Sequence, residues 1–256
     1  MMNFESSLGK NICYATFALF AAQAHAADLT ILTAGAFRQV VLAVVPSYEH
    51  DTGNHVVIKN DTAGALVKRI KSGEPFDLLI VPKPVMEQLA KSHLVVDDGK
   101  PLASVGIGVA VREGASKPDI STVAAFKATL LKAKKIAYID PGSGGSSGMY
   151  VANLLQRLGL ADALKNRIVL VQGGLVGEKV ADGSADIAIH QISELLPVKG
   201  VSIVGPLPEE IQSYTTYSGA VGTSAKEVGP ANAFLSSLTG PVGHEILAQK
   251  GMISAR

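Results

Sequence analysis

The sequence predicts an α/β fold built as two lobes that share one chain. Short apolar runs alternate with helical patterns from Leu29 onward, which is typical of strands covered by helices. A glycine-containing apolar run, Val105 to Val111, interrupts the series, and Thr215 to Val221 has the same extended character. We therefore expect two Rossmann-like lobes joined by two crossing strands, with a cleft at the carboxyl ends of the strands.

The elements follow in order along the chain. The first part predicts strands at 29–32, 55–58 and 78–81 and helices at 37–48 and 65–72, a pattern that indicates a parallel sheet with helices on both faces. Beyond the first crossing strand, helices are expected at 122–131, 149–158 and 175–181 and strands at 136–139, 168–171, 187–189 and 201–205.

Two helices, 225–238 and 241–249, close the chain, and the Thr223-Ser224 pair is the expected cap of the first. If these helices pack on the first lobe, that lobe is discontinuous. We place lobe I at 27–108 plus 217–256 and lobe II at 109–216.

Residues 1–26 have the pattern of a cleavable signal peptide. Lys10 precedes an apolar stretch at 12–22, and Ala24-His25-Ala26 is a small-x-small cleavage site. Cys13, the only cysteine, lacks the neighbours of a lipid-modified cysteine, and no later run approaches the roughly 20 apolar residues of a membrane span. An exported chain without disulfides or membrane anchor fits a bacterial periplasm.

Composition excludes several classes of function. The formal net charge is +1, and no basic stripe with interleaved aromatics points to nucleic acid. There is no His-x-x-x-His, cysteine pair or calcium-loop spacing for a metal, and neither a Ser-His-Asp triad nor a Walker loop can be assembled. A hydrophobic content of 47% with 18% charged residues indicates a compact globular protein.

Three loops rich in small residues each precede a predicted helix, at 32–36, 60–64 and 140–148. Unpaired N–H groups and the positive end of the helix dipole make such loops anion sites, so we expect one anion held from several sides. The candidate binding residues in these loops are Gly35, Ala36, Thr62, Ala63, Gly64, Ser143, Gly145, Ser146 and Ser147. The alternative is that Ser146 is only a helix cap and the glycines only shape the turn.

Charged and titratable side chains near these loops are the candidates for chemistry. His190, at the end of strand 187–189, is the candidate general base, unless it only packs there. Lys83 and then Asp61 are the reserve bases, although a charged Asp61 would repel an anion. Arg38 is expected to bind a carboxylate unless it faces solvent, and Gln191 to orient the substrate.

The chain resembles the periplasmic molybdate-binding protein family, the type II substrate-binding proteins of ABC transporters. The residues that carry this resemblance are Leu32-Thr33-Ala34-Gly35-Ala36, 65–73 with Phe76-Asp77-Leu78-Leu79-Ile80, Ile139-Asp140-Pro141, Gly148-Met149-Tyr150, Leu158-Gly159, Gly200-Val201 and Gly240-Pro241. The resemblance spans essentially the whole mature chain and implies the type II periplasmic binding protein fold.

The resemblance also bears on the ligand. Molybdate-binding members hold the oxyanion with serines in the first two loops and a tyrosine in a later one, and these positions fall here at Ala36, at Asp61-Thr62-Ala63-Gly64 and at Gln191. Each lost donor would cost about 1.5 to 3 kcal/mol, which disfavours molybdate.

The variant loops resemble a branch of this family that includes a bacterial aconitate isomerase. The resemblance implies a periplasmic isomerase that interconverts trans- and cis-aconitate by an allylic proton shift, without a metal or organic cofactor. The alternative is a binding protein that delivers a small organic acid or oxyanion to an ABC permease. A base aimed at a ligand carbon favours the enzyme, and a cleft with donors alone favours transport. Under either hypothesis we expect a monomer that binds a small anion, such as a di- or tricarboxylate.

Overall fold

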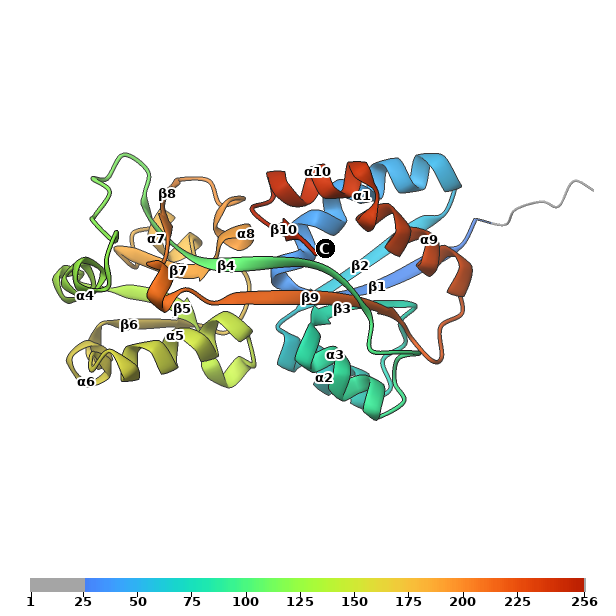
Figure 1. Ribbon diagram of the computed structural model, residues 1–256, viewed down its shortest axis with the longest axis horizontal. Helices are drawn as coiled ribbons and strands as arrows, with labels where there is room; N and C mark the ends of the chain where they lie inside the picture. Colours follow the sequence, from blue (N-terminus) through green and yellow to red (C-terminus); the bar gives the residue numbers. More distant parts are fainter. Residues whose placement is uncertain (1–25, 256) are drawn as a thin grey trace, which may run out of the picture.

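The computed structural model describes residues 26–255, which form two α/β lobes lying end to end (Figure 1). Each lobe has an apolar core of its own. The fold class expected from the sequence, two α/β lobes joined by two crossing strands, is confirmed. The expected signal peptide, with Cys13, lies outside the described residues except for Ala26.

Lobe I begins with three strand-helix units. Its elements are β1 (Asp28–Ala34), α1 (Gly35–Thr52), β2 (His55–Asp61), α2 (Ala63–Lys71), β3 (Leu78–Pro82) and α3 (Lys83–Lys91). The strands pair in parallel in the order β2-β1-β3, and β3 is buried along its whole length, as its unbroken apolar sequence requires. Parallel pairing brings the carboxyl ends of these strands, and the first turns of α1 and α2, to one edge of the sheet.

Two strands cross between the lobes, β4 (Lys100–Arg112) and β9 (Tyr214–Val221), drawn green and orange in Figure 1. Strand β9 pairs with β3, and β4 pairs with β9 over residues 100–106 before it enters lobe II. All of these pairs are antiparallel. The parallel pairing predicted for the first three strands is confirmed, and the crossing strands add antiparallel pairs because a chain that crosses to the other lobe and later returns runs in opposite directions.

Lobe II repeats the alternation of strands and helices. Its elements are α4 (Val123–Lys132), β5 (Ile136–Ile139), α5 (Ser146–Arg157), α6 (Ala161–Leu164), β6 (Ile168–Val171), α7 (Glu178–Ala181), β7 (Ile187–Gln191), α8 (Ile192–Leu195) and β8 (Val201–Pro206). Strand β5 lies between β6 and β7 in parallel, and β7 pairs antiparallel with the second half of β4. The carboxyl ends of β5 and β7 therefore face lobe I.

The C-terminal elements are α9 (Val228–Thr239), α10 (Pro241–Gln249) and β10 (Ile253–Ser254). Phe234, Leu238 and Leu247 from these helices belong to the same apolar core as Phe37 of α1. Strand β10 pairs with β4 in the lobe I part of the sheet. The end of the chain thus packs on lobe I, while the lobe boundaries at 108/109 and 216/217 stay a prediction.

Local differences from the expected elements have simple causes. Helix α3 was not among the expected elements, and its Pro84 lies in the first turn, where proline is well tolerated. Helix α7 is shorter than the expected 175–181. Thr223 and Ser224 do not cap α9, which begins at Val228 after Glu227 and has no side-chain cap.

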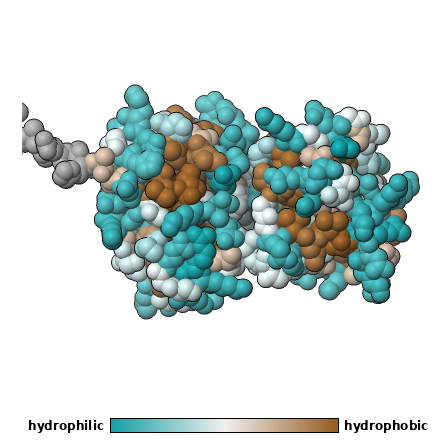
Figure 2. All heavy atoms as spheres, turned by 180° about the vertical axis from the view of Figure 1, so that it is seen from behind, coloured by the Kyte–Doolittle hydropathy of each residue, from teal (hydrophilic) through white to brown (hydrophobic). Residues whose placement is uncertain are grey.

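The surface carries apolar areas on both lobes. Figure 2, which views the face opposite to that of Figure 1, shows one such area on each lobe and a furrow between the lobes. Among the helices of residues 26–255, none has both the length and the apolar character that crossing a membrane requires.

Candidate functional site

Three helices begin where the two lobes face each other. Helices α1 and α2 begin at Gly35 and Ala63 in lobe I, and α5 begins at Ser146 in lobe II. Residues from the first turns of all three line one cavity between the lobes. The dipoles of three helix N-termini contribute a positive potential to this cavity without a lysine or arginine in its lining, which suits an anion.

We call this hollow the inner cavity, and its volume is about 40 Å³. It is lined by Gly35, Ala36, Asn60, Asp61, Thr62, Ala63, Ile139, Gly145, Ser146, Ser147, Gly174, His190, Gln191, Glu194 and Tyr217. Sites for drug-sized molecules measure roughly 300 Å³ or more, whereas one water needs only about 10–15 Å³. The inner cavity therefore suits a single carboxylate group or a small oxyanion rather than an entire tricarboxylate.

Direct contacts between the lobes make the inner cavity small. The hydroxyl of Thr62 donates to the carbonyl oxygen of Ser143 at 2.6 Å, and the N–H of Gly64 donates to the carbonyl oxygen of Gly144 at 3.2 Å. Thr62 Oγ1 also accepts the N–H of Ala65 as the cap of α2. The structure is thus a closed form of the cleft, in which the Thr62 hydroxyl already has its partners.

A buried His-Glu pair forms one wall of the inner cavity. His190 lies near the end of β7, and Glu194 follows one turn later on α8, with Nδ1 and Oε2 3.2 Å apart. Nδ1 also accepts the N–H of Gln191 at 2.8 Å. Because Nδ1 is an acceptor, the neutral ring carries its hydrogen on Nε2. Nε2 is buried and has no hydrogen-bond partner among the described residues.

The surroundings of this pair set its protonation. Burial raises the pKa of Glu194 to about 8 and lowers the pKa of His190 to about 3. No lysine or arginine is among the described residues that line the inner cavity, so no fixed cation opposes these shifts. At neutral pH the Glu194 carboxyl is therefore mostly protonated, and a small rise in pH ionises it. His190 is neutral and donates through its N–H.

Tyr217, Gln191 and Ser146 form a chain of hydrogen bonds across the inner cavity. The Tyr217 hydroxyl donates to Gln191 Oε1 at 3.0 Å, and Gln191 Nε2 donates to Ser146 Oγ at 3.3 Å. Burial, with the neighbouring Glu194 carboxyl as a smaller cause, raises the pKa of the Tyr217 phenol, which therefore keeps its proton. Gln191 thus links Tyr217 to Ser146, and a hydrogen bond between the Ser146 side chain and the Tyr217 phenol opposes the rise in the pKa of that phenol.

A second hollow adjoins the first, and we call it the outer hollow. Its volume is about 500 Å³, and it shares Ala63 and Ser146 with the inner cavity. Its lining is Ala63, Pro82, Lys83, Pro84, Val85, Gly144, Ser146, Met149, Tyr150, Ser213, Tyr214, Thr215 and Thr216, which come from both lobes and from β9. The cleft thus has a small closed part and a larger part beside it.

Most residues expected from the sequence lie at the inner cavity. These are Gly35, Ala36, Thr62, Ala63, Gly145, Ser146, Ser147, His190, Gln191 and the reserve base Asp61. The Asp61 carboxylate lies 3.4 Å from Arg69 Nη1 and also accepts the N–H of Thr62, so it is engaged in local contacts.

Four expected residues lie elsewhere. Arg38 is half-buried on α1 and lines neither hollow, and Lys83 lines the outer hollow instead. The Ser143 hydroxyl donates to the carbonyl oxygen of Asp140 at 2.8 Å, and Gly64 contacts Gly144 across the cleft. None of these four lines the inner cavity, and their contacts with a ligand stay predictions.

Sequence reasoning missed several lining residues, of which Glu194 and Tyr217 matter most. Glu194 stands four positions after His190, and this i, i+4 spacing beyond a strand end is the signal that would have found it. Tyr217 lies on β9 and contacts Gln191, the position where the family resemblance led us to expect a tyrosine. A phenol is therefore present in the cleft, but it comes from another strand.

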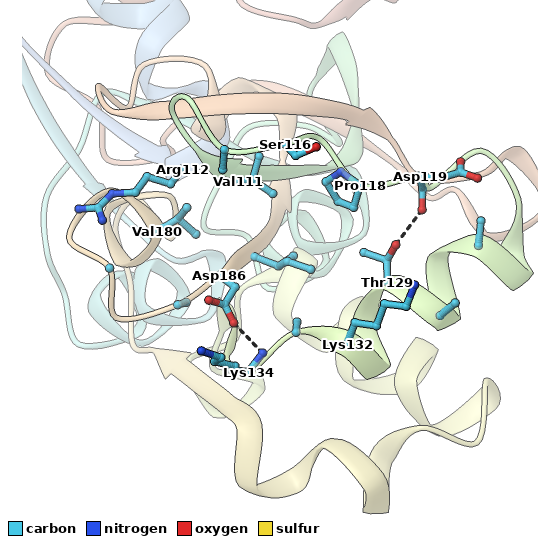
Figure 3. A pocket seen from close by; sticks show the side chains of 17 residues that line it. Val111, Arg112, Ser116, Pro118, Asp119, Thr129, Lys132, Lys134, Val180 and Asp186 are labelled. Carbon is cyan, nitrogen blue, oxygen red and sulfur yellow. Dashed lines mark hydrogen bonds between the residues drawn. The ribbon is translucent and has the colours of Figure 1, made fainter.

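A larger hollow of about 770 Å³ lies at the far end of lobe II (Figure 3). It meets β7 at Ile187, the opposite end of that strand from His190. The carboxylate of Asp186 accepts the N–H groups of Lys134 and Lys135 there, and the Thr129 hydroxyl donates to the carbonyl oxygen of Asp119. Open α/β sheets bind ligands at the carboxyl ends of their strands, so this hollow is in the wrong place for the principal site.

Within residues 26–255, no cluster of three or more His, Cys, Asp or Glu side chains is placed to hold a metal ion.

A family model described as bacterial extracellular solute-binding protein matches residues 29–253. The chain belongs to this family.

Two curated relatives and one solved structure are similar to this solute-binding protein. An aconitate isomerase from a Pseudomonas species is 34% identical over 88% of this chain and 87% of its own. The molybdate-binding protein ModA of Azotobacter vinelandii is 25% identical over 91% of this chain and 92% of its own. The solved structure of a periplasmic molybdate-binding protein from Azotobacter vinelandii gives a TM-score of 0.74 at 20% identity, covering 89% of this chain and all of the other, and so shows the shared fold.

Proposed function

We propose that this solute-binding protein is a periplasmic isomerase that interconverts trans- and cis-aconitate in the cleft between its lobes. One observation carries the proposal: a buried carboxyl, Glu194, lines the closed part of the cleft with a pKa near the working range of an acid-base catalyst. A protein that only carries its ligand needs donors but no such group. The similarity to an aconitate isomerase over most of both chains supports the same function.

The proposed reaction is an allylic proton shift with Glu194 as the base. Ionised Glu194 takes a proton from the methylene carbon of trans-aconitate, and the electron pair of that C–H bond spreads over the allylic system and its conjugated carboxylate. The protonated Glu194 then returns the proton to the former vinylic carbon, and the double bond moves to the neighbouring position. Atoms and charge balance, and the carboxylate is regenerated.

His190 serves this reaction as a donor, in contrast to the role of base that the sequence suggested. Its Nδ1 is occupied by the N–H of Gln191 and faces Glu194, so the available group is Nε2–H. That donor lacks a partner in the described residues, and a carboxylate bound in the inner cavity would supply one. Together with the Ser146 hydroxyl and the N–H groups of three helix termini, Nε2–H would stabilise the negative charge that develops on the substrate.

A second candidate function is the capture of a small organic acid for an ABC permease. It is favoured by the closed inner cavity, whose neutral donors and helix termini resemble what an anion carrier needs. The two functions use the same fold and differ in whether the ligand leaves unchanged.

The test is proton NMR of purified protein with trans-aconitate. We expect the cis isomer to form until equilibrium is reached, with incorporation of solvent deuterium when the reaction runs in D₂O and the proton on Glu194 exchanges. Heat-denatured protein is the control. Tight binding of trans-aconitate with no conversion would reject the isomerase and leave the carrier.

A further inference from the structure

The outer hollow contains a cation that the inner cavity lacks. Lys83 is the first residue of α3, and its side chain is 51% exposed within this hollow. Its Nζ lies 3.9 Å from Glu87 Oε1 on the next turn of the same helix, a long and solvent-exposed contact. Such a pair contributes little, so the ammonium is available to an incoming anion.

Size and charge divide the cleft in two. The inner cavity, at about 40 Å³, has room for one carboxylate, and the outer hollow of about 500 Å³ has room for the rest of an extended acid. Ala63 and Ser146 line both hollows, so a ligand with one end in the inner cavity would extend directly into the outer hollow. Pro82, Val85 and Met149 supply carbon surface along the outer hollow for a ligand backbone.

We propose that the outer hollow is a second carboxylate subsite, in which Lys83 binds a terminal carboxylate of an acid whose other end lies in the inner cavity. This inference rests on the proposed function and specifies its substrate class: acids with carboxylates at both ends of a short carbon chain. It gives Lys83 the role of a specificity-determining residue in place of the reserve base suggested by the sequence. A half-exposed ammonium is suited to holding a carboxylate.

The test compares trans-aconitate with two shortened ligands, each of which lacks one of its three carboxylates. Mesaconate is trans-aconitate with its CH₂–COO⁻ arm cut back to a methyl group, and itaconate has the skeleton of aconitate without the carboxylate at the other end. Calorimetric titration of the wild type and Lys83→Gln with each ligand gives six affinities. The control is Lys91→Gln, which makes the same charge change at the opposite, exposed end of α3.

We expect Lys83→Gln to weaken trans-aconitate about tenfold, the size typical of one charge-assisted contact near the surface. The effect should vanish for one of the two shortened ligands and persist for the other, which identifies the carboxylate that Lys83 binds. Lys91→Gln should leave all three affinities within about twofold of the wild type.

Two results would overturn the subsite. One is an unchanged affinity for trans-aconitate in Lys83→Gln, and the other is an equal loss for all three ligands, which would indicate a general effect of charge. Failure of the proposed function looks different, because the wild type would then not convert trans-aconitate, whether or not it binds it. If the wild type converts trans-aconitate and Lys83→Gln gives either of these two results, the isomerase stands and only the subsite is rejected.

Discussion

A Cβ atom added to Gly64 would lie 2.8 Å from the Cα of Gly144, and one added to Gly144 would lie 2.7 Å from the Cα of Gly64. These two glycines, one from each lobe, let the loops touch backbone to backbone when the cleft is closed. The N–H of Gly64 donates to the carbonyl oxygen of Gly144 at this point. Closure of the lobes therefore requires glycine on both sides.

Gly64→Ala should weaken ligand binding by hindering closure while leaving the fold intact. The added methyl group must push the two loops apart, and overpacking of this kind costs about 1–3 kcal/mol, or roughly 5- to 150-fold in affinity. Gly64 lies in the first turn of α2 with no positive φ, so alanine suits its backbone. Calorimetric titration with trans-aconitate measures the loss. Gly229→Ala, where a Cβ meets nothing within 4 Å, is the control, and equal affinities in both variants would reject this account.

Glu194→Gln should abolish isomerisation and spare binding. Glutamine keeps the shape of the side chain, but it cannot take a proton from carbon. We expect kcat to fall by about 100-fold or more and the dissociation constant of trans-aconitate to change by less than about threefold. Glu178→Gln, an exposed change on α7, should retain full activity. Turnover close to that of the wild type in Glu194→Gln would remove Glu194 as the base.

The pH profile of kcat/KM should follow the ionisation of Glu194. The base is active when ionised, and burial raises its pKa to about 8, so the rate should rise about tenfold per pH unit below this value and level off above it. His190 stays neutral throughout this range because burial lowers its pKa to about 3. Initial rates between pH 5.5 and 9.5 check the profile. A plateau that begins near pH 5 would indicate a base with an ordinary carboxyl pKa.

Asp77→Asn should destabilise lobe I. The Asp77 carboxylate accepts backbone N–H groups from Thr30 on β1 and from Lys226 and Glu227 before α9, and so ties the C-terminal helices to the first strand. An amide has only one oxygen for these donors, and we expect a loss of about 3 kcal/mol in the free energy of unfolding. Urea denaturation measures it, with the exposed Asp51→Asn as the control. A change below about 0.5 kcal/mol would show that these bonds add little.

The sequence was sufficient to predict the framework of the site but not its chemistry. Loops 32–36, 60–64 and 140–148 were expected to meet because strand-helix alternation puts their ends at one edge, and residues of all three line the inner cavity. Glu194 escaped notice because α8 is one turn long and shows no helical period. Tyr217 was not predicted because the direction of a side chain on a crossing strand depends on the pairing of that strand with its neighbours.

Arg38 and Lys83 show a related limit. Both were assigned to the cleft because they follow a strand end, yet only Lys83 faces a hollow. Position in a sequence places a residue in a turn of helix, but the side of the helix that faces the cleft depends on how that helix packs against its sheet. In α1, Phe37, Val40 and Val41 are buried, which leaves Arg38 on another side.

The inner cavity has no lysine or arginine among the described residues that line it, and this has a consequence for the effect of ionic strength. Helix termini, hydroxyls and a neutral imidazole in a closed cavity are shielded from dissolved ions, whereas the exposed ammonium of Lys83 is not. Added salt would therefore loosen the outer end of a bound acid first and leave the inner end in place. As the salt concentration rises, the protein would therefore lose its selectivity for long acids before it loses its affinity for a single carboxylate.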